Sequence, residues 1–431
     1  MRRQVLLHSA SVSTLQANVI RDEGDEVMNR TGLIVLAPIV IVFGLAQTTF
    51  GQAPEKKFIT PNGRRPTGLF APGVMVGKTL YVAGKGDYKP DEDTAGKVKN
   101  CLNEIRKTLK LAGMDMNNVV QSTIYLEDHD QYAEVNKHYA EFFPKDPPSR
   151  TTLGVAQVPG PSRLEITCVA YADLSEKKRI GDPPAGLPFS PGILAGDTLY
   201  ISGKGDQLSG GGHPATFEEQ VRQAMRNVEA TLKLAGLDFR HVVMSNVFLD
   251  RYENLEVTDK VYNEFFEDGS EPACSTSFVN WIPGGSHVEI TCIATTDLAG
   301  RKIVRPESIK TGPREGAVTA SPAVWAGNTL YLSALPGSAP TGDAATASVG
   351  DQVRRMAKGH VEILDKAGLK PEDIISGFVY LSDMKDYDAM NKVYSEYYSR
   401  GPGVRTCLMP GSDIEKSGIR VRGSFIAART R

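Results

Sequence analysis

The chain has 431 residues, of which 41% are hydrophobic, and its 49 Lys and Arg residues nearly balance its 51 Asp and Glu residues. This length exceeds one ordinary domain and predicts two to four domains, each with a core of its own. Because no run of like charges forms a basic stripe, the composition argues against a nucleic-acid-binding protein.

The first fifty residues have the layout of a secretory signal peptide. The stretch from Met28 has a short basic start, an uncharged apolar run over 32–46 and small residues up to Ala53. The apolar run is short for a membrane span and contains Pro38, so we expect cleavage near Ala53 rather than a retained anchor. Residues 1–53 are thus predicted to be an N-terminal extension and signal peptide. The mature form would be exported, periplasmic or secreted, without a stable membrane span.

The next elements are a predicted hairpin and a helix. Apolar and polar residues alternate around "TLYVAGKG" at 79–86, and the preceding Gly77-Lys78 suits the turn of a strand pair. Apolar residues then recur with a helical period over 98–111, until Gly113 ends the pattern.

A strand, a second helix and two further strands complete this unit. The four segments are "VVQSTIYLED" at 119–128, "HDQYAEVNKHYAEFF" at 129–143, "RTTLGVAQV" at 150–158 and "LEITCVAYA" at 164–172. The helix is amphipathic and the strands are mainly apolar. The order ββαβαββ predicts an α+β domain with both helices on one face of a mixed sheet.

The unit occurs three times. Its hairpin recurs without a gap as Val76–Asp87, Ala195–Asp206 and Ala326–Gly337. The predicted repeats are 66–174, 186–298 and 316–430, and polar linkers at 175–192 and 299–317 join them. Helices on one face leave the other face of each sheet bare, so we expect the three bare faces to pack around one axis. The predicted architecture is an intramolecular pseudo-trimer.

The cysteine pattern indicates neither a disulfide framework nor a metal site. The five cysteines are Cys101, Cys168, Cys274, Cys292 and Cys407. They show no close CxxC spacing, so they are predicted to be buried thiols that pack as small apolar groups. No Cys or His cluster has ligand spacing, and neither a metal nor another cofactor is predicted.

Several segments together form a recognisable pattern: "SGKGD" at 202–206, the Ala-Gly helix stop, "VNKHYAEFF" at 135–143 and "PPSRTTLGV" at 147–155 with the following "LEITCVAYA". In these segments the chain resembles the RidA/YjgF family of imine and enamine deaminases. The resemblance covers about 66–430, three times over. It implies a chorismate-mutase-like fold and a ligand cleft between neighbouring units. Members of the family usually form homotrimers. In this protein one chain would supply all three units and would be a monomer.

In the family, an arginine before the penultimate strand binds the substrate carboxylate. A planar guanidinium suits this task because it gives two parallel, charge-assisted hydrogen bonds. Arg150 and Arg405 match that position, whereas the second repeat has Cys274. The resemblance therefore predicts an anion site at no more than two of three junctions, and the alternative is that both are ordinary surface arginines. Because the second repeat has lost its arginine, we expect Cys274→Arg to be tolerated.

In the family, a glutamate on the last strand helps position or activate the attacking water. We match Thr167, Thr291 and Ser424 to it as candidate catalytic residues. A hydroxyl can orient a water but cannot act as its base near neutral pH, and loss of a positioned base costs about 10²- to 10⁴-fold in rate. Glu165 and Glu289 lie about 6.5 Å away on the same strand face. For these two a structural role is the favoured interpretation.

Other positions match the family's ligand-contacting residues. The predicted set is Phe70 and Phe189 as aromatic covers, Gly84 and Gly203 as turn residues that offer backbone groups, and Asn136 and Asn391 on the second helix. Ala320 replaces the aromatic residue in the third repeat and Asp259 replaces the asparagine in the second. The two phenylalanines fit the core of a repeat equally well.

Two functions remain open at this point. The first is a hydrolytic deaminase of small imines or enamines that carry a carboxylate. The second is a non-catalytic pseudo-trimer that binds small carboxylates, which the replacement of the family's glutamate favours. A third function, endoribonuclease, is disfavoured because the charge is near neutral and aromatic-basic clusters are lacking. The predicted partner is a small-molecule carboxylate, not a nucleic acid.

Overall fold

The structure of the chain is a computed structural model that describes residues 53–89, 91–309, 320–337, 347–411 and 418–431. The predicted signal peptide lies outside these residues except for Ala53. Residues 51–431 form one compact unit. Within the described ranges, no helix is both long and apolar enough to cross a membrane.

Repeat 1 has the predicted order of elements. It contains β2 (Gly73–Val76), β3 (Thr79–Gly86), α1 (Thr94–Leu111), β4 (Val119–Leu126), α2 (Tyr132–Ala140), β5 (Ser149–Gly154) and β6 (Leu164–Tyr171). β4 and β5 are parallel, and the other neighbouring strands are antiparallel. Asp93 caps α1 by accepting from the Gly96 N–H at 2.7 Å. α1 ends before Gly113, as the sequence predicted, and this glycine has a left-handed φ of 74°.

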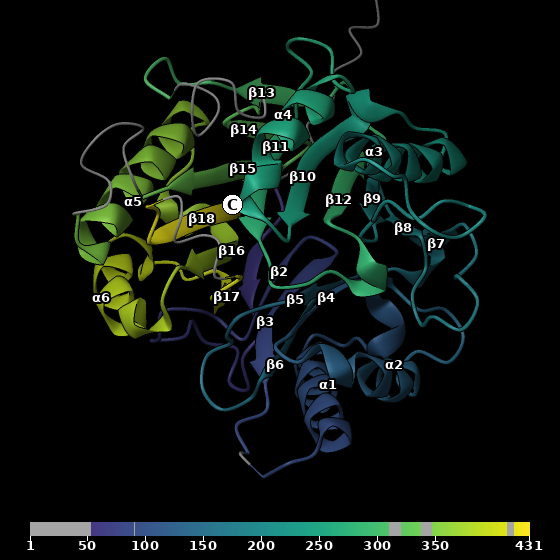
Figure 1. Cartoon of the computed structure of the whole chain (residues 1–431). Helices are drawn as coiled ribbons and strands as arrows, with labels where there is room; N and C mark the ends of the chain where they lie inside the picture. The colour runs from purple at the N-terminus through teal and green to yellow at the C-terminus, as the bar shows by residue number, and fades with distance from the viewer. Residues whose placement is uncertain (1–52, 90, 310–319, 338–346, 412–417) are drawn as a thin grey trace, which may run out of the picture. The chain divides into compact units, whose positions relative to one another are not determined.

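Repeats 2 and 3 follow the same order (Figure 1). Repeat 2 contains β8 (Gly192–Ala195), β9 (Thr198–Ile201), α3 (Phe217–Leu234), β10 (Val242–Leu249), α4 (Leu255–Asn263), β11 (Ala273–Phe278) and β12 (Val288–Thr295). Repeat 3 contains β14 (Ala323–Ala326), β15 (Thr329–Pro336), α5 (Val349–Lys366), β16 (Ile374–Leu381), α6 (Tyr387–Tyr398), β17 (Val404–Leu408) and β18 (Val421–Ala428).

Each sheet has one strand more than the sequence predicted. β1 (Lys56–Phe58), β7 (Lys177–Ile180) and β13 (Lys302–Val304) pair with β2, β8 and β14 and bring each sheet to six strands. They lie ahead of the predicted repeat starts, and β7 and β13 lie inside segments predicted to be linkers. An edge strand pairs along one side only, and the lysine-rich β7 is half-exposed to exposed throughout. It therefore lacks the apolar alternation that reveals an inner strand.

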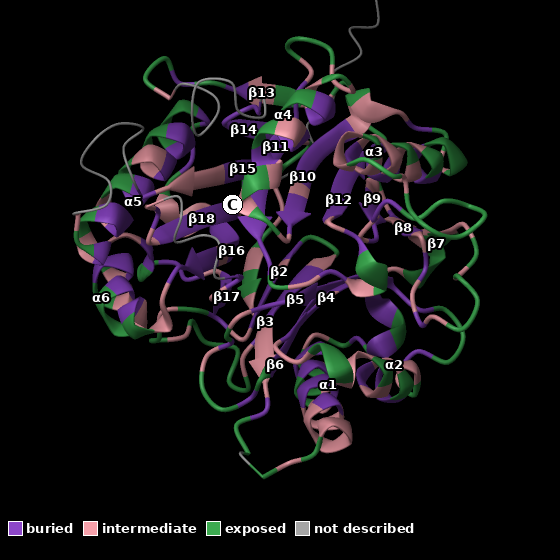
Figure 2. Ribbon diagram, viewed as in Figure 1, coloured by how far each residue is buried: buried purple, intermediate pink, exposed green. Residues whose placement is uncertain are grey.

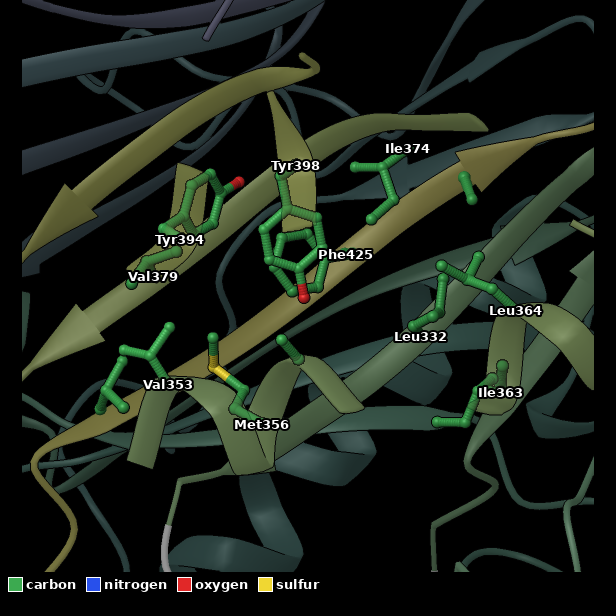
Figure 3. Packing of buried hydrophobic residues seen from close by; sticks show 14 of the residues in the cluster. Leu332, Val353, Met356, Ile363, Leu364, Ile374, Val379, Tyr394, Tyr398 and Phe425 are labelled. Atoms are coloured by element: carbon green, nitrogen blue, oxygen red, sulfur yellow. The ribbon is translucent and has the colours of Figure 1, made fainter. Parts of the chain in front are cut away.

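Each sheet and its two helices enclose a separate core. Figure 3 shows this core in repeat 3, where Phe425 on β18 meets Tyr394 and Tyr398 on α6. The ring centroids of Phe425 and Tyr398 are 5.1 Å apart. The five cysteines are free and buried in these three cores, which confirms their prediction as packed thiols.

The opposite faces of the three sheets are buried against one another. One shared cluster contains Tyr125, Phe248 and Tyr380, which occupy the same position in β4, β10 and β16. A second shared cluster contains Tyr200 and Tyr331 together with residues of repeat 1. The strands are consequently mostly buried, whereas the helices also carry exposed residues (Figure 2). This confirms the predicted pseudo-trimer.

We call the contact between two repeats a seam and name it by its repeats. All three seams contain the same backbone hydrogen bond. Its donors are the amides of Ser190 in seam 1–2, Ser321 in seam 2–3 and Ala71 in seam 3–1, and its acceptors are the carbonyls of Pro148, Pro272 and Gly403, at 2.9 to 3.0 Å. In the first two seams the serine hydroxyl adds a second bond, to the Pro147 and Glu271 carbonyls. Ala71 cannot make this bond, so seam 3–1 needs other contacts.

Basic side chains at the start of each repeat bind carbonyls of the preceding repeat. Lys177 binds the Asn117 and Val119 carbonyls, and Arg301 binds that of Val242. Lys56, the first residue of β1, binds three carbonyls of repeat 3. They belong to Glu372 (2.7 Å), Ile374 (2.7 Å) and Gly401 (3.1 Å). Since no linker joins repeat 3 to repeat 1, Lys56 helps to close the ring.

Candidate functional site

Arg150 lies on β5 at seam 1–2 and is only 3% exposed. Its backbone is held by repeat 2, since its N–H donates to Ser202 Oγ (2.8 Å) and its carbonyl accepts from the Gly203 N–H (3.1 Å). Its guanidinium carbon lies 5.1 Å from the ring centroid of Tyr139 and 5.0 Å from that of Phe189. The predicted residues Arg150, Phe189 and Gly203 thus come together from two repeats.

The guanidinium of Arg150 faces helix α2. Its Nη2 lies 3.5 Å from the Tyr132 hydroxyl, and Asn136 is one helical turn further along the same face. Nη1 of Arg150 and Oδ1 of Asn136 are both buried and have no hydrogen-bond partner among the described residues. Burial lowers the pKa of Arg150. A buried guanidinium nitrogen without a partner carries a desolvation penalty, which a bound anion would relieve.

Repeat 2 adds a carboxyl group and an amine to the same seam. Burial raises the pKa of Glu289 to about 8, against the opposing effects of Arg150 and Lys204. Burial also lowers the pKa of Lys204 to about 8. A Cβ at Gly203 would collide with the Glu289 carboxyl group, so the glycine leaves the space that this carboxyl occupies. We call this group of side chains the Arg150 site.

Seam 3–1 contains a matching group, with Arg405 from repeat 3. Arg405 is 5% exposed, and its guanidinium carbon lies 5.3 Å from the ring centroid of Phe70 in repeat 1. Its Nη1 donates to Asn391 Oδ1 (2.7 Å) and its Nη2 to the Tyr387 hydroxyl (3.2 Å). Phe70 is 42% exposed and belongs to the rim of this seam rather than to a core.

The carboxyl group of seam 3–1 is that of Glu165. Burial raises the pKa of Glu165 to about 8, opposed by Arg405, by a hydrogen bond with Thr406 and by Lys85. Gly84 makes room for this carboxyl as Gly203 does for Glu289. The structure thus brings the predicted Arg405, Asn391, Phe70 and Gly84 together, and we call this group the Arg405 site.

Among the described residues, seam 2–3 has no such group. Cys274 takes the arginine position, and Arg422 and Leu335 take the positions of the glutamate and the lysine. Arg422 Nη1 donates to the carbonyl of Thr276, two residues beyond Cys274 on β11. Ala320 and Asp259 likewise replace the phenylalanine and the asparagine. Both sides of this seam have therefore lost residues that form the Arg150 site and the Arg405 site.

The predicted catalytic hydroxyls lie elsewhere. Thr167, Thr291 and Ser424 line a cavity of about 70 Å³ that residues of all three repeats share, and neither arginine lines it. Thr167 Oγ1 donates to the Val82 carbonyl, and Thr291 Oγ1 donates to the Ile201 carbonyl, each at 2.7 Å. The structure does not bring these hydroxyls to the arginines, whereas Glu165 and Glu289 do lie beside them.

Sequence reasoning missed the tyrosines and lysines of these sites. Tyr132 and Tyr387 occur only in the repeats that supply an arginine, since the second repeat has Leu255 at that position. Lys85 and Lys204 occur only in the repeats that face an arginine. This pattern was a usable signal, but it requires knowing that each site combines two consecutive repeats. The described part of the chain holds no cluster of three or more residues that could bind a metal.

Comparisons with known proteins agree with this architecture. The family model described as Endoribonuclease L-PSP matches residues 62–172, 180–296 and 316–409. A RutC family protein of Pyrococcus horikoshii is 32% identical over 125 residues, which are 28% of this chain and 99% of that protein. A 2-iminobutanoate/2-iminopropanoate deaminase of Mus musculus is 37% identical over 114 residues, which are 26% of this chain and 84% of the mouse protein.

Among solved structures, a chorismatase has a TM-score of 0.50 at 12% identity, covering 72% of this chain and 93% of the chorismatase chain. This likeness concerns the fold alone and extends over most of the three-repeat ring. The YjgF gene product of E. coli is 28% identical, with a TM-score of 0.27, and covers 28% of this chain and 99% of its own. With three tandem matches to the family model over more than half of its length, the chain belongs to the Endoribonuclease L-PSP family, as the resemblance to the RidA/YjgF family predicted.

Proposed function

We propose that the chain hydrolyses small imines or enamines that carry a carboxylate, at the Arg150 site and the Arg405 site. The observation that carries this proposal is a buried arginine beside a buried glutamate of raised pKa in two of the three seams. The arginine would bind the substrate carboxylate through its planar guanidinium. The name of the mouse relative, which describes a deaminase of 2-imino acids, supports the same class of substrate.

The glutamates, rather than Thr167, Thr291 and Ser424, are the proposed catalytic residues. With a pKa of about 8, Glu289 and Glu165 are protonated at neutral pH. The carboxylic acid donates its proton to the imine nitrogen and makes the adjacent carbon more electrophilic. The resulting carboxylate then accepts a proton from the water that attacks this carbon.

The intermediate of this attack carries a hydroxyl and an amino group on the same carbon. The glutamic acid protonates the amino group, the C–N bond breaks, and the carboxylate takes the hydroxyl proton as the C=O bond forms. One imine and one water thus yield one 2-oxo acid and one ammonia, and the glutamic acid is regenerated. The same side chain donates a proton twice and accepts a proton twice in one cycle. A pKa near the working pH suits both the donating and the accepting steps.

The proposal is tested with 2-iminobutanoate generated in the assay, by measuring ammonia release above the spontaneous rate. We expect Glu165→Gln/Glu289→Gln and Arg150→Met/Arg405→Met each to lower kcat/KM by about 10²- to 10⁴-fold. Thr167→Val/Thr291→Val is the matched control and should stay within a few-fold of the original chain. If the threonine pair loses as much activity as the glutamate pair, the hydroxyls are the catalytic groups and our assignment is wrong.

The alternative is a pseudo-trimer that binds small carboxylates without turnover. In its favour, both η nitrogens of Arg405 already have partners within repeat 3. The same assay separates the two functions. A chain that binds carboxylates through its arginines but leaves the rate of imine hydrolysis unchanged would be a binding protein.

A further inference from the structure

The Arg150 site and the Arg405 site contain the same residue types but differ in how these residues pair. In the Arg405 site, Nη1 of the arginine is bonded to the asparagine oxygen of Asn391 at 2.7 Å. In the Arg150 site, Nη1 of Arg150 and Oδ1 of Asn136 are both buried, and neither has a partner among the residues that the structure describes. In the Arg405 site the arginine and the asparagine therefore bond to each other. In the Arg150 site a donor nitrogen and an acceptor oxygen are available to a ligand.

The tyrosine contacts differ in the same direction. The Tyr387 hydroxyl lies 3.2 Å from Nη2 of Arg405, whereas the Tyr132 hydroxyl lies 3.5 Å from Nη2 of Arg150. A ligand at Arg405 must therefore compete with two partners of the guanidinium. A ligand at Arg150 competes only with the long hydrogen bond to Tyr132. It also gives hydrogen-bond partners to buried polar atoms, which lower the stability of the protein while they have none.

A tryptophan distinguishes the two sites further. Trp281 of repeat 2 packs on Gly154 at the end of β5, where a Cβ would collide with its ring, and its ring centroid lies 6.3 Å from that of Tyr132. Its indole Nε1 is also buried without a partner in the described part of the chain. In seam 3–1 the equivalent pair is Met409 and the exposed Gln157. The Tyr132 of the Arg150 site thus has an indole ring beside it, which seam 3–1 lacks at the equivalent position.

We propose that the Arg150 site is the primary ligand site of the chain and that it selects small acids with an N–H group on the carbon next to the carboxylate. The carboxylate accepts from Nη1 of Arg150 and the ligand N–H donates to Oδ1 of Asn136. The Arg405 site binds the same acids more weakly. This inference rests on the proposed function in one respect, namely that the ligand carries a carboxylate. The new element is that Asn136 recognises the imine or enamine nitrogen.

Two stable acids of equal size test this selection. Oxamate carries an NH₂ group on the carbon next to its carboxylate, and pyruvate carries a methyl group in its place. Trp281 and Trp325 are the two tryptophans of the chain. In a Trp325→Phe chain, the fluorescence of Trp281 reports on the Arg150 site, and calorimetry counts both sites.

We expect oxamate to bind in two steps whose dissociation constants differ by about tenfold or more, with the tighter step lost in Arg150→Met. Asn136→Ala should weaken oxamate about tenfold at the tighter step and leave pyruvate nearly unchanged. Asn391→Ala is the matched control, and we expect it to raise affinity where Asn136→Ala lowers it. It frees Nη1 of Arg405 and should strengthen the binding of both acids at the weaker step.

Equal affinities at the two sites, or a tighter step that disappears in Arg405→Met instead, would overturn the inference. If either result is accompanied by arginine-dependent imine hydrolysis, the proposed function stands and only the ranking of the sites fails. If neither acid binds and no hydrolysis is accelerated, the inference and the proposed function fail together.

Discussion

At the scale of single residues, His360 shows how the three copies have diverged inside their cores. It is fully buried in α5, at the position that Ile105 and Val228 occupy in the other two repeats. Its Nε2 lies 3.2 Å from the Ser333 carbonyl. Burial lowers the pKa of His360 to about 4. The native state thus keeps this imidazole neutral where the unfolded chain already protonates it.

We therefore expect His360 to make repeat 3 sensitive to acid. Between about pH 6.5 and pH 4 the unfolded state binds a proton that the native state does not, so the free energy of unfolding falls by about 3 kcal/mol. Urea unfolding, followed by Trp325 fluorescence in a Trp281→Phe chain, measures this. The control His360→Ile introduces the side chain that repeat 1 has at this position. In this variant the free energy of unfolding should fall much less between pH 6.5 and pH 4. Equal acid sensitivity of both chains would refute the assignment.

Cys274 gives a second prediction at this scale, and it differs from the sequence-based expectation that Cys274→Arg is tolerated. Cys274 is buried, and its seam contains Arg422 where the other seams have a glutamate. We expect Cys274→Arg to lower the free energy of unfolding by about 3 kcal/mol or more, because it buries a second guanidinium in the seam that already contains that of Arg422. Adding Arg422→Glu should recover part of the loss in thermal unfolding. Additive effects of the two changes would argue against a pairing of these positions.

At the scale of elements, the glycines that end the first hairpin determine where a carboxyl group can lie. Gly84 and Gly203 lie against the carboxyl groups of Glu165 and Glu289, whereas repeat 3 has Ala334 and Arg422 at the matching positions. The sequence predicted these glycines as sources of backbone groups for a ligand. The Gly203 N–H is instead bonded to the Arg150 carbonyl.

Gly203→Ala should therefore affect turnover more than stability. The new Cβ displaces the end of a flexible side chain, so we expect less than about 1 kcal/mol of destabilisation but a loss of at least tenfold in kcat/KM at the Arg150 site. The measurement is imine hydrolysis in an Arg405→Met background. Gly210→Ala is the matched control, because a Cβ there meets only open space. A Gly203→Ala chain with unchanged kcat/KM would show that the Glu289 position is unimportant.

The inner elements could be predicted from the sequence because burial leaves a pattern. Leu80 and Val82 alternate toward the core on β3, and α1 carries an apolar stripe that ends at Gly113. The edge strand β7 could not be predicted, since its basic residues carry no such pattern. The site was found in part. Arg150 and Arg405 stood out by their family position, but the glutamates beside them are identified by contacts across a seam that no single repeat contains.

At the scale of the whole molecule, the ring has two seams with a chain connection and one without. Seam 3–1 relies on Lys56, on Arg65, which donates to the Ser399 carbonyl at 2.8 Å, and on backbone bonds from Ala71 and Arg431. The serines that bridge the other seams, such as Ser190 and Ser202, are replaced here by alanines. Seam 3–1 thus has the same backbone arrangement as the other two seams but is held by different side chains.

We expect Lys56→Met to loosen seam 3–1 selectively. Three carbonyls lose their charged donor, which should lower the free energy of local opening by about 2–4 kcal/mol. Hydrogen exchange at the Ala71 and Arg431 amides, both bonded across this seam, measures the opening. Lys177→Met is the control, and there the amide of Ser190 should stay protected because seam 1–2 retains its serine bonds and its covalent connection. Equal loss of protection in both variants would show that the seams are held alike.

Ring closure through Lys56 also bears on how the protein is made. The carbonyls that this lysine binds belong to Glu372, Ile374 and Gly401, so the Lys56 ammonium has no partner across seam 3–1 until most of the polypeptide has left the ribosome. Until then the parts of the first two inner sheet faces that pack against repeat 3 stay uncovered, and such surfaces invite association between nascent chains. A product truncated before the third copy would keep these parts uncovered and would depend on chaperones to remain dispersed.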